Sequence, residues 1–261
     1  MNRNYEKISE GVLIKKGRSL SDLTRRLGDA EYAFFDLDGT IYPSLFILDV
    51  ADKVFSAGCA AGEKKHIEKK RALDTLVSVS RQSDFRELYE KFIVLLEGER
   101  CDTFSSCAKQ FAKNLCPGAK DFVSLLHGRG IKCILVSLTP EFIAEIVKAE
   151  IGFDGFWSMK YGVSVVKSRK MFAGNYVLDY PNFSDFKKAA LGKYGLGAKD
   201  KARIIFSGNG AEDLGLFDSA GLTIAVNPHN ALLKRKSFDI ILDDFKNAPW
   251  ARLTELFGGS P

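Results

Sequence analysis

The pattern of apolar and polar positions predicts a chain in which buried strands alternate with amphipathic helices. Continuous apolar runs are typical of strands that are covered on both faces. Short runs of this kind occur at five places along the chain, residues 31–36, 131–136, 203–206, 222–226 and 238–242. Segments with helical spacing of apolar residues separate most of them, which predicts a three-layer α/β fold around a mostly parallel sheet.

One long segment between the first two strands breaks this alternation. Residues 44–115 show no strand pattern and contain three glycines as their only breakers, and apolar residues recur at helical spacing over 63–80 and 85–96. We expect this segment to form a helical cap inserted into the core. The expected divisions are an α/β core, a helical cap and an N-terminal basic extension, at residues 31–43 with 116–261, 44–115 and 1–30.

The remaining patterns predict helices, one short strand and a hairpin. A short helix should follow Ser19, and Pro117-Gly118 should start another that ends near Gly130. Two further helices are expected over 140–150 and 184–194, the second capped by Ser184. A short strand over 153–157 and a hairpin over 161–180 complete the prediction.

The composition narrows the class of protein. Of the 261 residues, 46% are hydrophobic and 27% charged, as in soluble globular proteins. The five cysteines include no Cys-x-x-Cys pair, which disfavours a zinc site or a disulfide framework. This cysteine usage and the lack of a signal-peptide pattern predict a cytoplasmic protein. No apolar run approaches the ~18 residues of a membrane span, so we expect no membrane partner.

The net charge of +5 suits anionic small molecules as well as nucleic acid. The basic run 64–71 is interpreted as a solvated helix face, which makes nucleic acid an unlikely partner. The alternatives are that this run attracts acidic substrates or contacts nucleic acid. The oligomeric state stays open.

Two carboxylates stand where the first predicted strand ends. The run 32–35 leads into Asp36-Leu37-Asp38-Gly39-Thr40, so both acids lie at the edge where open α/β sheets bind their ligands. Neighbouring buried carboxylates require a cation, a proton or hydrogen-bond donors. One carboxylate of such a pair can attack an electrophile while the other moves a proton. The alternative is a solvated loop with acidic caps.

Three later features also end or follow strands. Ser137 ends the second strand and could bind a phosphate oxygen, or it could cap a helix in competition with Thr139. Lys187-Lys188 could neutralise a phosphate, or could form a solvated helix face. The loop 207–213 follows another strand with glycines and then acids, which suits a hard cation near a phosphate.

These four features, in this order, resemble the haloacid dehalogenase-like superfamily of phosphohydrolases over about residues 31–245. The segment Leu135-Val136-Ser137-Leu138-Thr139-Pro140-Glu141-Phe142 and the helical insert resemble its phosphoserine-phosphatase-like branch. The resemblance implies a Rossmann-like core with a cap, an Mg²⁺ cofactor and a small phosphorylated substrate. It implies hydrolysis of a phosphomonoester through an aspartyl-phosphate intermediate.

The resemblance also implies roles for individual residues. Asp36 would be the nucleophile and Asp38 the general acid and base, with Ser137 and Lys187 completing the catalytic group. Lys187 is preferred over Lys188 because Leu191 follows it at the family's Lys-x-x-x-Leu spacing. The residues that would bind the phosphate are Leu37, Thr40, Ser137, Leu138 and Lys187. The residues that would hold Mg²⁺ are Asp36, Asp38, Asn209, Glu212 and Asp213.

Three positions depart from the family pattern. Asn209 stands where an aspartate is usual, and Glu212 and Asp213 are the candidates to compensate for the lost charge. Leu45 and Glu90 stand where the branch has its amine-reading glutamate and carboxylate-reading arginine, so a substrate other than L-phosphoserine is expected. The alternatives to a working phosphatase are a slow one, a protein that only binds a phosphorylated ligand, and a phosphotransferase.

Overall fold

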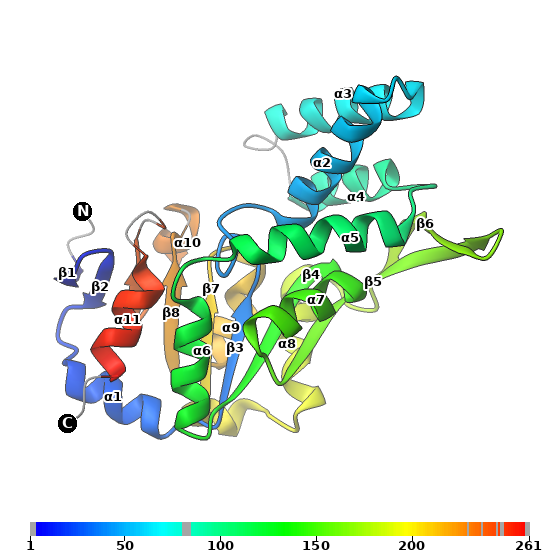
Figure 1. Cartoon of the computed structure of the whole chain (residues 1–261). Helices are drawn as coiled ribbons and strands as arrows, with labels where there is room; N and C mark the ends of the chain where they lie inside the picture. The colour runs from blue at the N-terminus through cyan, green and yellow to red at the C-terminus, as the bar shows by residue number, and fades with distance from the viewer. Residues whose placement is uncertain are drawn as a thin grey trace.

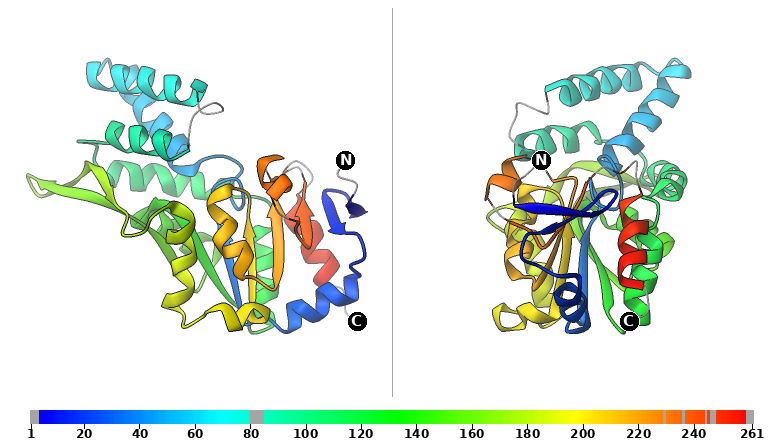
Figure 2. Two further views of the ribbon diagram at one scale, coloured as in Figure 1. Left: turned by 180° about the vertical axis from the view of Figure 1, so that it is seen from behind. Right: turned by 90° about the vertical axis from the view of Figure 1, so that its left-hand side faces the viewer.

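The computed structural model describes residues 4–79, 85–228, 230–235, 237–243, 245 and 248–258. They form a nine-stranded sheet in the order β1-β2-β9-β8-β7-β3-β4-β5-β6, with helices on both faces (Figure 1). A group of helices lies beyond one edge of this core (Figure 2). The predicted α/β class with a mostly parallel, three-layer arrangement is confirmed.

The central strands run parallel and are buried on both faces. In sheet order they are β9 (Ile240–Leu242), β8 (Leu222–Val226), β7 (Ile204–Gly208), β3 (Tyr32–Asp36) and β4 (Lys132–Pro140). Successive side chains of β3 point to opposite faces, so Phe35 joins one core cluster and Phe34 the other. Burial on both faces explains why these strands read as continuous apolar runs.

Helices cover the two faces of the sheet in separate groups (Figure 1). The face that holds Phe35 packs against α6 (Ala119–Gly128), α7 (Glu141–Ile151) and α11 (Pro249–Gly258). The face that holds Phe34 packs against α8 (Phe183–Lys193), α9 (Leu214–Ser219) and α10 (Asn230–Arg235). Short 3-10 turns are η1 (Ala112–Asn114), η2 (Ala198–Arg203) and η3 (Ala211–Asp213).

The N-terminal residues contain more structure than the sequence predicts. Helix α1 (Leu20–Gly28) begins after Ser19, whose side chain accepts a hydrogen bond from the N–H of Asp22, as expected. Two strands precede it, β1 (Tyr5–Ser9) and β2 (Val12–Lys15), and β2 pairs antiparallel with β9. The four residues of β2 are too short a pattern to stand out, and its pairing with β9 decides its conformation.

The insert between β3 and β4 is helical, as predicted. Its helices are α2 (Phe46–Ala60), α3 (Lys64–Val79), α4 (Phe85–Leu95) and α5 (Cys101–Phe111). They lie beyond the carboxyl ends of the parallel strands (Figure 1). The predicted domain boundaries stay a prediction. None of the helices that the structure describes combines the length and the hydropathy needed to cross a membrane.

The predicted short strand and hairpin form a single unit. Strand β5 (Gly155–Val166) is continuous, and β6 (Arg169–Val177) pairs with it antiparallel. The turn between them places Lys167 and Ser168 at positive φ, the conformation of a two-residue hairpin turn. The first part of β5 pairs parallel with β4, so one strand serves both the central sheet and a protruding hairpin (Figure 2).

Candidate active site

Three central strands bring the candidate residues to one edge of the sheet. Asp36 is the last residue of β3 and pairs in register with Val136, so Ser137 lies on β4 one residue beyond the level of Asp36. The predicted end of the second strand at residue 136 is too early, because β4 continues to Pro140. The loop that begins at Asn209 follows β7, the other neighbour of β3. Because these strands are parallel, their carboxyl ends meet at the same edge, where α/β sheets bind ligands.

Helix α8 brings a lysine to the same edge. The helix begins after Asn182, whose side chain accepts a hydrogen bond from the N–H of Asp185. The predicted cap at Ser184 is therefore wrong, because the Ser184 hydroxyl accepts instead from the N–H of Gly215 at 2.9 Å. This contact ties α8 to α9 and fixes the direction in which Lys187 points.

Lys187 joins the carboxylate at the end of β3 to a carboxylate in the turn η3. Its Nζ donates to Asp36 Oδ1 at 2.6 Å and to Asp213 Oδ1 at 2.7 Å. The Lys187 side chain is 2% exposed, whereas the neighbouring Lys188 is exposed to solvent. Of the two adjacent lysines, Lys187 is therefore the one that lies at the site.

The charges of this group are strongly coupled. Burial raises the pKa of Asp36 well above its ordinary value, Lys187 opposes this, and the negative charge of Asp213 adds to it. Burial would lower the pKa of Lys187, but Asp213 and Asp36 outweigh it, so the pKa of this lysine is raised. Lys187 therefore stays charged, and the carboxylates around it favour a further positive charge.

Asp38 is held beside this group by the start of the helical insert. Its Oδ1 accepts a hydrogen bond at 2.6 Å from the N–H of Phe46, the first residue of α2. Burial raises the pKa of Asp38 to about 6, and the hydrogen bond from Phe46 partly opposes the rise. A carboxyl group in this range can both give and take a proton near neutral pH.

The neighbours of Asp36 along the chain take different positions. The hydroxyl of Thr40 donates to Asp36 Oδ2 at 3.2 Å, so Thr40 orients this carboxylate. The side chain of Leu37 is fully buried in the apolar core and leaves its backbone as the polar part near the site.

Ser137 is fully buried within β4. Its hydroxyl hydrogen-bonds to that of Thr139 and accepts from the Thr139 N–H at 3.0 Å. Helix α7 begins after Pro140 without a side-chain cap, so the alternative that Ser137 or Thr139 caps this helix is wrong. Leu138 lies between these two hydroxyl groups.

The loop after β7 is organised around Asp213. Its Oδ2 accepts hydrogen bonds from the backbone N–H groups of Asn209 at 2.9 Å and of Gly210 at 3.0 Å. Both Asp213 oxygens thus have partners, because Oδ1 accepts from Lys187. The Asn209 amide lies against Gly39, where an added Cβ would come within 1.8 Å of Asn209 Nδ2. Gly39, with φ of +72°, leaves the room that Asn209 occupies beside Asp38.

Glu212 adds negative charge to the same region. Its charge contributes to the raised pKa of both Asp38 and Lys187. Within the described residues, no group of three or more His, Cys, Asp or Glu side chains is arranged to hold a metal ion. A metal at this edge would therefore use a mixed set of carboxylate, amide and backbone oxygens, which Mg²⁺ accepts.

The helical insert contributes a tyrosine that the sequence did not single out. The hydroxyl of Tyr89 on α4 lies 2.6 Å from the carbonyl oxygen of Leu138 and 2.9 Å from the hydroxyl of Tyr161 on β5. Tyr89 shares helical spacing with Phe85 and Phe92, so the pattern indicates only a buried helix face. A tyrosine among phenylalanines was the one available signal, because a buried hydroxyl needs a partner.

A model of the haloacid dehalogenase-like hydrolase family matches residues 33–218. This span is most of the chain and includes every candidate residue from Asp36 to Asp213. The chain belongs to the haloacid dehalogenase-like hydrolase family.

Two curated relatives of this haloacid dehalogenase-like hydrolase are phosphoserine phosphatases. The one from Polaromonas sp. (strain JS666 / ATCC BAA-500) is 24% identical over 205 residues, which cover 77% of this chain and 80% of the relative. The one from Lactococcus lactis subsp. lactis (strain IL1403) is 26% identical over 180 residues, or 69% and 80% of the two chains. With the family, they identify this haloacid dehalogenase-like hydrolase as a phosphoric monoester hydrolase.

The fold also matches solved structures of other proteins. A protein of unknown function from Bordetella pertussis Tohama I superposes with a TM-score of 0.65 at 20% identity, covering 83% of this chain and 99% of that chain. A cytosolic 5′-nucleotidase IIIB bound to cytidine superposes with a TM-score of 0.62 at 13% identity, covering 96% and 95%. The haloacid dehalogenase-like chain thus shares its core and insert with proteins of very different sequence.

Proposed function

We propose that this protein is an Mg²⁺-dependent phosphatase that hydrolyses a small phosphomonoester through a phosphorylated Asp36. The observation that carries the proposal is the buried contact of Lys187 with Asp36 and Asp213. A buried ammonium group beside a carboxylate at a strand end can neutralise an incoming phosphate and orient the carboxylate that attacks it.

In the proposed first step, an Asp36 oxygen attacks the phosphorus atom, and the bond from phosphorus to the ester oxygen breaks. Asp38 gives its proton to the departing oxygen, which leaves as an alcohol. In the second step Asp38 takes a proton from water, the hydroxide attacks phosphorus, and Asp36 is released with inorganic phosphate. The pKa of Asp38, raised by burial to about 6, suits a group that gives and then takes a proton.

Other residues hold the phosphate during both steps. The Ser137 hydroxyl and the backbone N–H groups near Leu37 and Leu138 would donate hydrogen bonds to its oxygens. Lys187 would balance the charge that spreads over these oxygens during transfer. Thr40 keeps Asp36 oriented through the bond at 3.2 Å to Oδ2.

The residues at this edge fit Mg²⁺. The ligands would be an Asp36 carboxylate oxygen, the Asp38 carbonyl oxygen and the Asn209 amide oxygen, with Glu212 near enough to influence the charge. When bound, the ion would stabilise negative charge on the phosphate oxygens. We propose a positioning role for Asp213, because its carboxylate already accepts hydrogen bonds from Lys187, Asn209 and Gly210.

We propose a substrate other than L-phosphoserine, although two curated relatives are phosphoserine phosphatases. Leu45, at the start of α2, offers no charge for an amine. Glu90 accepts hydrogen bonds from Arg86 at 3.0 Å and from Tyr176 at 3.2 Å, and its negative charge would repel the carboxylate of a substrate.

We also propose a cytosolic location for the protein. All five cysteines are free thiols, which is typical of proteins in a reducing compartment.

The test is hydrolysis of an aryl phosphate by the wild type and Asp36→Asn, with and without Mg²⁺. We expect turnover only with Mg²⁺ and a loss of at least about a thousandfold in the variant. Phosphate release that persists in Asp36→Asn would overturn the covalent role of Asp36. If the wild type binds a phosphorylated ligand without turnover, the result would support a binding protein. If it transfers phosphate to an added alcohol, the result would support a phosphotransferase.

A panel of phosphomonoesters tests the identity of the substrate. A clear preference for L-phosphoserine would contradict the proposal of a different substrate.

A further inference from the structure

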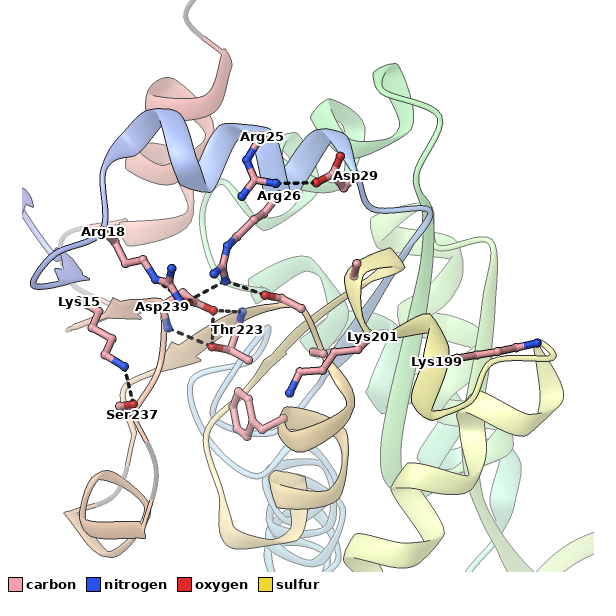
Figure 3. Close-up of a pocket in the computed structure, with 14 residues that line it drawn as sticks. Lys15, Arg18, Arg25, Arg26, Asp29, Lys199, Lys201, Thr223, Ser237 and Asp239 are labelled. Atoms are coloured by element: carbon pink, nitrogen blue, oxygen red, sulfur yellow. Dashed lines mark hydrogen bonds and ion pairs between the residues drawn. The ribbon is translucent and has the colours of Figure 1, made fainter.

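A basic cavity lies at the opposite end of the sheet from Asp36. It has a volume of about 640 Å³ and is bordered by α1, η2 and the amino ends of β8 and β9. Thr223, near the start of β8, and Asp239, just before β9, line it (Figure 3). Its size falls within the range of ordinary small-molecule sites, roughly 300–1,000 Å³.

The charge of this cavity is strongly positive. Six of its lining residues are basic: Lys15, Arg18, Arg25, Arg26, Lys199 and Lys201. Two of its lining residues are acidic, Asp29 and Asp239. Asp22 also pairs with the three arginines, so the basic residues around the cavity outnumber the acidic ones.

Two guanidinium groups are fixed at the centre of the cavity by one buried carboxylate. Asp239 Oδ1 lies 3.2 Å from Arg26 Nη1 and 3.4 Å from Arg18 Nε. Its Oδ2 accepts hydrogen bonds from the N–H and the hydroxyl of Thr223 at 3.1 and 3.0 Å. In the described part of the chain, the Nη2 groups of Arg18 and Arg26 donate no hydrogen bond, so each arginine keeps donors for a ligand.

Two lysines flank this centre. Lys15 Nζ donates to the hydroxyl of Ser237 and Lys201 Nζ to the carbonyl oxygen of Asp218, each at 3.0 Å. Both acceptors are neutral groups, so these bonds orient the ammonium groups without cancelling their charge. Figure 3 shows Lys15 and Lys201 on either side of the arginine pair, whereas Lys199 extends away from it.

A purely structural role accounts for part of this arrangement. Arg26 also donates to the carbonyl oxygen of Gly221 at 2.9 Å, so Arg18 and Arg26 hold α1 against the sheet. This role gives no reason for Lys15 and Lys201, which come from other elements. Their convergence on the same cavity is the observation that points to an anionic ligand.

We propose that this cavity binds a small organic molecule that carries at least two phosphate groups. Guanidinium and ammonium groups are the usual partners of phosphate oxygens. The positive groups are spread over both sides of the cavity, which suits a ligand with more than one anionic group. Ala202, Ala220 and Phe217 add apolar lining that its organic part can contact.

The test is calorimetric titration of the full chain with ATP, in the absence of divalent metal. We expect one saturable site whose affinity falls at least about tenfold in the double variant Lys15→Ala, Lys201→Ala. Lys199→Ala, which removes a lysine that extends away, is the matched control and should bind within about twofold of the wild type. Lys201 is exposed and Lys15 is partly buried, so a thermal melt of each variant checks that the fold is kept.

Three outcomes would overturn the proposal. An ATP affinity of the double variant equal to that of the wild type would show that ATP binds outside this cavity. An affinity of the wild type for adenosine equal to that for ATP would show that the phosphate groups do not contribute to binding. Loss of ATP binding in Ser137→Ala would place it at the catalytic edge. The double variant should hydrolyse an aryl phosphate as the wild type does, so a failure of the proposed hydrolysis is recognised separately.

Discussion

The hydroxyl of Tyr89 donates a hydrogen bond to the carbonyl oxygen of Leu138 at 2.6 Å. Tyr89 belongs to the helical insert, and Leu138 directly follows Ser137 on the central strand β4. This bond therefore joins the insert to the backbone that we propose to bind phosphate. Because both groups are buried, the bond is expected to matter for how the insert closes on the substrate.

Tyr89→Phe tests this connection, because it removes the hydroxyl and keeps the ring. We expect kcat/KM for an aryl phosphate to fall roughly fivefold, the equivalent of about 1 kcal/mol for one hydrogen bond. Tyr176→Phe is the matched control, since its hydroxyl donates to the exposed Glu90 at 3.2 Å. Equal effects of the two changes would contradict a specific role for the contact with Leu138.

Lys187→Met should destabilise the fold strongly. The change leaves the buried carboxylates of Asp36 and Asp213 without their shared cation, and breaking a buried ion pair costs about 3–5 kcal/mol. Urea unfolding followed by circular dichroism measures the loss. Lys188→Met, one residue on at an exposed position, should change the free energy of unfolding by less than about 0.5 kcal/mol. A loss below 1 kcal/mol for Lys187→Met would contradict the ion pairing described here.

Asn209→Asp should tighten Mg²⁺ binding. It adds a negative charge beside Asp38, and a unit charge at about 4 Å is worth roughly 4 kcal/mol at an effective dielectric of 20. We expect at least about a tenfold lower Mg²⁺ concentration for half-maximal activity. Asn182→Asp, the same change at the cap of α8, serves as the control. Equal Mg²⁺ requirements for wild type and Asn209→Asp would count against the placement of Asn209 at the metal.

We expect the ionisation of Glu99 to make the free energy of unfolding depend on pH. Burial would raise its pKa, but hydrogen bonds from His66 and Lys69 outweigh this and lower it from 4.5 to about 2. The folded state thus prefers the ionised form, which contributes on the order of 3 kcal/mol above pH 4.5. This stabilisation is lost as the pH falls from 4.5 toward 2.

The measurement compares the free energy of urea unfolding of the wild type and Glu99→Gln at pH 7 and at pH 3. The difference in the free energy of unfolding between the wild type and Glu99→Gln should be large at pH 7 and smaller at pH 3. Glu97→Gln changes an exposed residue two positions away and is the control. A difference that stays constant with pH would show that ionisation of Glu99 does not stabilise the fold.

Much of the fold follows from local pattern. The runs that contain Phe34 and Ile134 are apolar because both faces of the central strands are covered, so burial leaves a direct record in the sequence. The strands β1 and β2 left no such record. Strand β2 pairs with β9, more than 220 residues further along the chain, and β1 pairs in turn with β2, so local propensity does not contain the pairing that decides their conformation.

By itself, the sequence determined that two aspartates follow a buried strand and that later motifs follow in the order of a haloacid dehalogenase-like hydrolase. The spacing of Lys187 and Leu191 favoured Lys187 over Lys188 by resemblance alone, and only the tertiary structure showed that Lys187 contacts Asp36 while Lys188 is exposed. It also showed that Asp213 holds Lys187 and the Asn209 loop together. The physical reason is that a strand end is fixed by contacts within a few residues, whereas the direction of a side chain on a helix depends on how the whole helix packs.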